Sequence, residues 1–516
     1  MHLSAASRTT AFSERFITLL LVTILSVAST VLMLALTSPE FSWDEADYVA
    51  STANSWHFLW SDSDYNRHGH GPMAIYLAKL GQEVLPASVS LERRMRFFDA
   101  LVASLGIGFL YWTLRRSFKT SKSAALVGSG LLLFSVIRLE ETNVVGPHHL
   151  MLLTTLAIFG LGYHWRDQPT LQAGLGLGVA MGFGALSMTY VIPATLCWAM
   201  AITLAGSGWF TWNSSHFNVS WSIPIMLATA TFLLLVLWPP GVLQHVVISN
   251  FRWYLHYGPS TALVGNHVVR PAPRWAALYW LAHLDAPILV FSLVILSAGV
   301  WKVWRKRRLS SKHAYLAICL AFLLGTALSA HLAGSRNLLQ FIGVLCLATG
   351  ALYDDAIEHD AIDHDAVKDR SRLGRFGAAA IIVVAALNLV WLSRSSSYIP
   401  FLATDGYRAF MKENQSRLQE RVKAQAFNTP AFEVYAQATG TPVAWDLGEV
   451  AWNPRADAPL PADVKYVLIP AFIYDDMPPD QPMRRVVAAH WKRVWCHREG
   501  HAWELRLYEN PNPIAP

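Results

Sequence analysis

Long apolar segments separated by polar loops are the feature that most restricts how this 516-residue chain can fold. The first segment, residues 16–37, contains no charged side chain and is long enough to cross a bilayer as a helix, since about 20 residues suffice. Only 15% of the residues are charged, against about 25% in a typical soluble protein. The chain is therefore predicted to be an all-α polytopic membrane protein. Its apolar segments fall near residues 16–37, 97–114, 123–137, 148–163, 171–206, 221–238, 280–300, 314–333, 338–353 and 376–392.

Two of the intervening loops are strongly basic, and the positive-inside rule places such loops in the cytoplasm. They contain Arg115, Arg116, Lys119 and Lys122, and Lys302, Arg305, Lys306, Arg307, Arg308 and Lys312. An even number of spans must separate two loops on the same side. This condition is met if residues 171–206, which are too long for one crossing, form two helices that break near Tyr190–Pro193. We predict about 11 transmembrane helices, with the N-terminus in the cytoplasm and the C-terminus outside.

This topology divides the chain into a transmembrane part, residues 1–400, and a soluble outer part, residues 401–516. The first outer loop covers residues 38–96. Residues 354–375 form a cytoplasmic linker whose Asp and His residues are interpreted as solvated rather than metal-binding. In the tail we predict a helix at 406–426, a strand at 466–470 and a hairpin over 493–509 that turns at Glu499-Gly500. The outer part is therefore predicted to be a small extracytoplasmic α/β domain.

Three carboxylates cluster just beyond the first apolar segment, in Trp43-Asp44-Glu45-Ala46-Asp47-Tyr48. Residues 45–60 have the pattern of an amphipathic helix lying along the membrane interface. The acids then either favour the positive end of that helix dipole or serve chemistry at the membrane surface. Helical spacing places Asp44, Asp47 and Tyr48 on one side of the helix, with Glu45 about 100° away.

A second polar motif follows in the same loop, Arg67-His68-Gly69-His70-Gly71-Pro72-Met73-Ala74-Ile75-Tyr76. Its glycines and proline predict a tight turn before another helix. The turn carries a guanidinium and two imidazoles, and a His-x-His sequence either binds a metal ion or remains an ordinary polar loop.

An Asp-Glu pair after the first span, followed by Gly71-Pro72-x-x-x-Tyr76, resembles the membrane glycosyltransferases of superfamily C. The likeness is to the protein O-mannosyltransferase and lipid A aminoarabinose transferase group, a family 39-like set. Three later motifs are similar to the same family: Pro147-His148-His149-Leu150-Met151-Leu152, Trp275-Ala276-Ala277-Leu278-Tyr279-Trp280-Leu281 and Ser335-Arg336-Asn337-Leu338-Leu339. The resemblance covers most of residues 10–400 and rests on the ordered set of motifs.

The resemblance implies an inverting enzyme that moves a sugar from a polyprenyl-phosphate carrier to an acceptor hydroxyl outside the membrane. By similarity, Asp44 is the general base, since proton abstraction needs a positioned carboxylate. Glu45 orients the acceptor or pairs with a cation, and Tyr48 binds the sugar or phosphate. The leaving phosphate needs cationic partners, for which Arg336 is the first candidate. The alternatives are Arg67 and His70, which lie in the same turn motif as the further substrate-binding candidate Tyr76.

The chain departs from the family at the fourth span, where relatives often carry an acid and this sequence has His148. The missing acid is supplied by Glu140 or Glu141, or else His148 binds the phosphate or holds a metal with Asp44 or Asp47. A divalent metal ion is thus an open alternative, and no other cofactor is expected.

Polar residues also lie at or inside other predicted spans. Asp99 begins the second span, where a charge is by default a functional hypothesis, but pairing with Arg96 is the preferred interpretation. His283, Asp285 and His331 lie near predicted outer ends, where they either line the cavity or simply lie at the interface.

The competing functions are transport of a polyprenyl-linked glycolipid or polysaccharide without catalysis, and an inactive relative that serves assembly. A transporter would favour repeated halves and broken helices at the midplane, and the sequence shows no internal repeat. The net charge of +6 resides mainly in the loops, so it does not indicate nucleic acid, and no Walker or dinucleotide motif is present. The expected partners are a polyprenyl-phosphate sugar, a glycolipid, polysaccharide or protein acceptor, and the bilayer. The expected location is a bacterial inner membrane.

Overall fold

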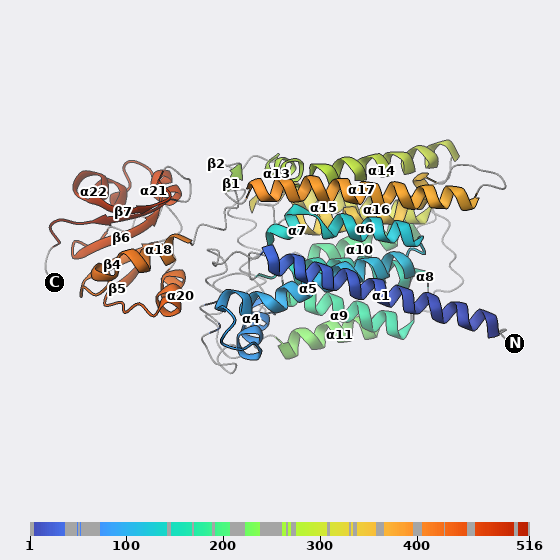
Figure 1. The fold of residues 1–516 in the computed structure, drawn as a ribbon, viewed down its shortest axis with the longest axis horizontal. Helices are drawn as coiled ribbons and strands as arrows, with labels where there is room; N and C mark the ends of the chain where they lie inside the picture. Colours follow the sequence, from blue (N-terminus) through green and yellow to red (C-terminus); the bar gives the residue numbers. More distant parts are fainter. Residues whose placement is uncertain are drawn as a thin grey trace.

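A computed structural model gives the fold of the chain. The residues that it describes are 5–36, 49, 52, 73–141, 146–167, 170–187, 191–206, 222–237, 261–264, 267–269, 275–306, 310–329, 332–333, 338–357, 366–395, 405–427, 429–450, 460–499 and 504–513. Helices run side by side along the long axis of the molecule, and a smaller sheet-containing part lies at one end of them (Figure 1).

The helical part is built mainly from long apolar helices, with a few short ones at their ends. Its helices are α1 (Ala5–Leu36), α4 (Met73–Val84), α5 (Leu91–Arg116), α6 (Lys122–Leu133), α7 (Val136–Glu140), α8 (His148–Asp167), α9 (Leu171–Ser187), α10 (Val191–Gly206), α11 (Ser222–Leu237), α13 (Ala276–Leu284), α14 (Ala286–Lys306), α15 (Ser311–Ser329), α16 (Leu339–Ile357) and α17 (Ala366–Ser395). The predicted break in residues 171–206 is confirmed, because α9 ends at Ser187 and α10 begins at Val191.

Within the described ranges, three helices are both long and apolar enough to cross a membrane, at Phe16–Ala35, Leu91–Arg116 and Ala286–Arg305. Several further apolar helices are shorter, such as Leu171–Ser187 and Ile223–Val236. The mostly helical character of the membrane part is thus confirmed, apart from the short strands described below, whereas the number of spans stays a prediction.

The predicted inner and outer loops fall into two separate groups. Asp354 accepts hydrogen bonds from Ser121 N and Oγ, both at 2.6 Å, and Asp355 lies 2.5 Å from Lys312 Nζ. These contacts join three segments predicted to lie inside. At the other end, β1 (Thr261–Val264), antiparallel to β2 (His267–Val269), pairs in parallel with β3 (Leu332–Ala333), which joins two segments predicted to lie outside. The predicted grouping of the loops therefore matches the structure, and which group faces the cytoplasm stays a prediction.

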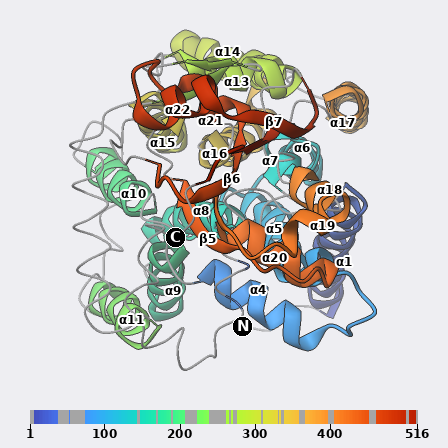
Figure 2. The same ribbon diagram turned by 90° about the vertical axis from the view of Figure 1, so that its left-hand side faces the viewer.

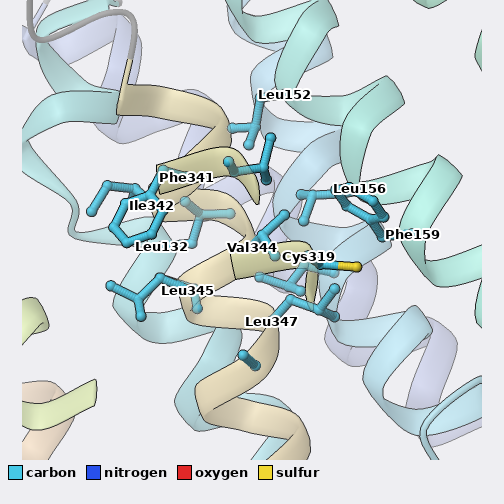
Figure 3. Packing of buried hydrophobic residues seen from close by; sticks show 14 of the residues in the cluster. Leu132, Leu152, Leu156, Phe159, Cys319, Phe341, Ile342, Val344, Leu345 and Leu347 are labelled. Carbon is cyan, nitrogen blue, oxygen red and sulfur yellow. The ribbon is translucent and has the colours of Figure 1, made fainter. Parts of the chain in front are cut away.

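The core of the helical part lies where α6, α8 and α16 meet (Figure 3). Leu132, Leu156 and Ile342 are fully buried there. Glycines let α6 and α16 approach closely: a Cβ on Gly350 would stand 3.2 Å from the Cα of Gly128, so any larger residue would push the helices apart. Leucine and valine side chains of α1, α11 and α14 are instead exposed, as expected of surfaces that face lipid.

The C-terminal part is an α/β fold around a five-stranded sheet with the order β5-β4-β6-β8-β7. Its strands are β4 (Lys423–Phe427), β5 (Asp446–Val450), β6 (Val464–Pro470), β7 (Lys492–His497) and β8 (Leu505–Glu509), and its helices are α18 (Asp405–Glu413), α19 (Gln415–Leu418), α20 (Thr429–Thr439), α21 (Ala471–Asp476) and α22 (Pro482–His490). β4 pairs in parallel with β5 and β6, whereas β8 is antiparallel to both β6 and β7.

The predicted strand at 466–470 and the predicted hairpin are confirmed by β6 and by the antiparallel pair β7–β8; Gly500, at the predicted turn, lies outside the described residues. The single helix predicted over 406–426 is wrong. Two short helices occupy its first part, and Lys423–Phe427 is a strand because it completes the sheet beside β6. The predicted linker 354–375 is helical at both ends, since α16 extends to Ile357 and α17 begins at Ala366.

The C-terminal part packs against the end of the first predicted outer loop. A guanidinium nitrogen of Arg408, on α18, hydrogen-bonds the buried carboxylate of Glu92 on α5. One hydrophobic cluster joins Ile75 and Ala78 of α4 to residues of the sheet and its helices, among them Tyr407. Seen along the bundle, the sheet and α18–α20 lie across the ends of the helices (Figure 2).

Candidate functional site

Most of the residues predicted to act in the site lie outside the described part of the chain. They are Asp44, Glu45, Asp47, Tyr48, Arg67, His70 and Arg336. The predicted interfacial helix at 45–60 also falls largely outside it, as does His331. The roles of these residues stay predictions. Tyr76, Glu141 and His148 are described, and they fall in two places.

Glu141 and His148 are brought together at the head of α8. Glu141 follows α7 directly, and His148 is the first residue of α8. The imidazole Nδ1 of His148 lies 3.1 Å from Oε2 of Glu141, with the two side chains 5% and 2% exposed. A carboxylate therefore stands beside the histidine at the position where the family resemblance predicts an acid.

Tyr76 lies on α4, where it packs against the hydrophobic cluster that α4 shares with the C-terminal part. Burial raises the pKa of its phenol from 10.0 to about 12. The phenol therefore stays neutral at physiological pH, and the contact that the structure shows for the ring is packing against this cluster.

A second carboxylate–histidine pair lies next to the first. Asp99 Oδ2 on α5 is 2.6 Å from Nδ1 of His149, and both residues are buried. The other ring nitrogen, Nε2, lies 3.4 Å from the backbone oxygen of Arg138. Since both neighbours are acceptors, the network is satisfied when both ring nitrogens donate. The partner that the structure shows for Asp99 is thus His149 on another helix, whereas the sequence favoured Arg96.

A buried network fixes the short helix that leads to Glu141. The carboxylate of Asp285, at the junction of α13 and α14, accepts hydrogen bonds from Ser135 Oγ at 2.7 Å and Val136 N at 2.8 Å. Ile137 N, at 3.3 Å, and Asn388 Nδ2, at 3.2 Å, also donate to it. A carboxylate at a helix N-terminus satisfies backbone donors that would otherwise lack partners. Asp285 therefore anchors α7 and does not act as the cavity-lining group that the sequence left open.

Arg138, in the middle of α7, connects this short helix to its surroundings. Its fully buried guanidinium donates to the backbone oxygens of Leu132 and Leu133 at 2.9 and 2.8 Å and to Ser29 Oγ at 3.0 Å. These bonds join the end of α6 to α1. The short helix beside the two carboxylate–histidine pairs is thus held by buried hydrogen bonds that join distant parts of the chain, for which no local sequence pattern exists.

The described residues include only His148 of the predicted metal site. The described ranges contain no group of three or more His, Cys, Asp and Glu residues arranged to hold an ion. The proposed metal site combines His148 with Asp44 and Asp47, which lie outside those ranges, so it stays a hypothesis.

Comparison with known proteins supports the class inferred from the sequence. Residues 69–240 match the family model described as dolichyl-phosphate-mannose-protein mannosyltransferase. No curated protein sequence matches the chain. Among solved structures, the chain is similar to ArnT from Cupriavidus metallidurans bound to undecaprenyl phosphate, with 12% identity, a TM-score of 0.55 and coverage of 96% of this chain and 99% of that one. It is also similar to the apo oligosaccharyltransferase of Archaeoglobus fulgidus, with 12% identity, a TM-score of 0.54 and coverage of 91% and 72%.

These likenesses establish the fold over nearly the whole chain. Together with the family match over residues 69–240, they confirm the predicted resemblance to membrane glycosyltransferases of superfamily C. The matched segment contains both carboxylate–histidine pairs, those of Glu141 with His148 and of Asp99 with His149.

Proposed function

We propose that the chain is a glycosyltransferase that moves a sugar from a polyprenyl-phosphate carrier to an acceptor hydroxyl on the outer side of the membrane. The observation that carries this proposal is the match of residues 69–240 to a family model of mannosyltransferases. The matched segment includes the Glu141–His148 pair at the head of α8, which we assign to the site. The fold likeness to ArnT, whose structure holds undecaprenyl phosphate, supports a lipid-linked donor. We place the protein in a bacterial inner membrane, with the C-terminal part in the periplasm.

In the proposed reaction, the carboxylate of Asp44 takes the proton of the acceptor hydroxyl. The acceptor oxygen attacks the anomeric carbon from the face opposite the phosphate. The bond between that carbon and the phosphate oxygen breaks, the electron pair stays on the phosphate, and the anomeric centre inverts. A partly desolvated site suits a carboxylate base, because desolvation brings its pKa closer to the working pH. Glu45 orients the acceptor.

The departing phosphate gains negative charge and needs positive or hydrogen-bonding partners. We assign this role to Arg336, with Arg67 and His70 as alternatives, and place Tyr48 against the sugar. Nδ1 of His148 faces Glu141 at 3.1 Å, so Nε2 is the ring atom that we assign to the phosphate or, in the alternative with Asp44 and Asp47, to a divalent ion.

The test is transfer of radiolabel from a panel of polyprenyl-phosphate sugars by purified protein in lipid nanodiscs. We expect Asp44→Asn to lose transfer by a factor of about 100 or more, as for loss of a general base, and His148→Ala to weaken it. Asp480→Asn, which removes an exposed acid just before α22, is the matched control and should leave transfer unchanged.

Two outcomes would contradict the proposal. Donor binding without turnover for every sugar in the panel would favour the transporter. Full activity of Asp44→Asn would remove that residue from the role of base. Elution of each variant as a single species of wild-type size excludes misfolding as the cause of any loss.

A further inference from the structure

An apolar groove of about 570 Å³ lies between α1 and α5, with Leu153 of α8 contributing to its wall. It is separate from the carboxylate–histidine pairs described above. Val22 and Leu105 line its apolar length, and Trp112 and Arg116 line one end. The two helices run in opposite directions, since Glu14 lies near Arg115 while residues 22 and 26 lie against Gly108.

The groove has the length of one leaflet. From Leu105 to Arg116 the axis of α5 rises by roughly 17 Å at 1.5 Å per residue. Half of a typical hydrocarbon core is about 15 Å. The groove therefore runs from near the midplane to one membrane surface and has the reach of a single acyl chain.

The end of the groove at Arg116 is positively charged. Arg116 is exposed and makes no ion pair with the part of the chain that the structure describes. The neighbouring cations Arg115 and Lys122 face Glu14, at 4.0 and 3.5 Å. Arg116 and the exposed Lys119 are therefore the cations that can bind an anion that is not part of the protein. Cationic side chains at the membrane surface attract anionic lipids by about 1 kcal/mol each.

We propose that this groove binds one chain of an anionic phospholipid, whose headgroup phosphate lies against Arg116. The lipid comes from the leaflet that faces the loop at residues 117–121. It fills the seam between α1 and α5 and so holds the first helix against the rest of the bundle.

The polyprenyl-phosphate donor is not the occupant that the geometry favours. Asp99 and Arg116 are separated by roughly 25 Å along the axis of α5, and Asp99 marks the level of the histidine pairs. Arg116 is the last residue of α5, whereas Glu92, near the start of the same helix, contacts Arg408 of the C-terminal part. A phosphate held at Arg116 is therefore too far from His148 to react there.

The test is native mass spectrometry of delipidated protein with added phosphatidylglycerol or phosphatidylcholine of the same chain length. We expect one phosphatidylglycerol to be retained in preference to phosphatidylcholine. Arg116→Gln should weaken its retention about fivefold, the equivalent of about 1 kcal/mol. Arg305→Gln, an equal change of charge at an exposed position near the end of α14, is the matched control.

A second pair of variants tests the apolar part of the groove. Leu105→Trp, which fills it, should also lower retention, whereas Leu227→Trp on the exposed face of α11 should not. Equal retention of the two lipids, equal effects of Arg116→Gln and Arg305→Gln, or displacement of phosphatidylglycerol by stoichiometric undecaprenyl phosphate would each overturn the proposal. Sugar transfer is not part of this readout, so the result is independent of the proposed enzyme activity.

Discussion

Replacing Asp285 by alanine should destabilise the protein strongly. The substitution removes the acceptor for Val136 N and for the hydroxyl of Ser135, which are buried and bonded at 2.8 and 2.7 Å. Asn388 keeps a second bond, to the backbone oxygen of Phe134 at 2.8 Å, so it loses less. Each buried donor left unsatisfied costs about 1–3 kcal/mol, which gives about 4 kcal/mol for the two main losses together.

The assay is reversible unfolding in mixed micelles as the fraction of denaturing detergent rises, followed by circular dichroism. Asp285→Asn should lie between the wild type and Asp285→Ala, because its carboxamide oxygen still accepts one hydrogen bond. Ser135→Ala, which removes one of the partners, should cost about 1 kcal/mol. If Asp285→Ala unfolds within about 0.5 kcal/mol of the wild type, as ordinary surface substitutions do, the carboxylate does not anchor α7 and the reasoning is refuted.

Three further predictions concern the paired residues and the outer contacts. Asp99→Asn should lower the kcat of sugar transfer by up to about 100-fold, the effect of an ångström-scale displacement of the histidine. The neutral amide holds His149 less firmly than the carboxylate does, and KM should change little. A change confined to KM would contradict this prediction. Arg408→Ala should expose the C-terminal part to limited proteolysis, because Glu92 loses its partner; an unchanged digestion pattern would exclude a docking role. The raised pKa of Tyr76, about 12 against 10.0, means that the folded state keeps a proton that the unfolded state loses, so stability should fall as pH rises from 10 towards 12. Tyr76→Phe should reduce that fall in unfolding measured at pH 9 and 11, and an unaltered slope would show that the phenol is not the group concerned.

The helices of the membrane part could be predicted from the sequence because their signal is local. Residues 171–206 are too long for one span, and the parity of the basic loops independently required the break that lies between α9 and α10. The strand at Lys423–Phe427 could not be recognised in the same way. It follows two helices directly, and its neighbour β6 lies about 40 residues further along the chain, so long-range pairing decides its conformation.

The candidate site, like the fold, could be predicted where its contacts are close in sequence and not where they join distant parts of the chain. The sequence predicts Glu140 or Glu141 as the acid near His148, and the structure places Glu141 3.1 Å from it. The role of Asp285 could not be inferred, since its partners Ser135 and Val136 lie about 150 residues earlier in the chain. The pairing of Asp99 with His149 likewise joins two helices, whereas a local sequence pattern can indicate only a neighbour on the same helix, such as Arg96.

The shared packing of α4 and the C-terminal part has a consequence for how the protein is made. Ile75 and Ala78 are buried in a cluster that is completed only by residues after 405. During synthesis, α4 therefore emerges long before the segment that covers it, and its apolar side must rest on the membrane surface in the meantime. The last part of the chain to be translated thus covers the apolar side of a helix near its beginning. We expect chains truncated before α18 to leave the apolar side of α4, in the first outer loop, without the residues that bury it.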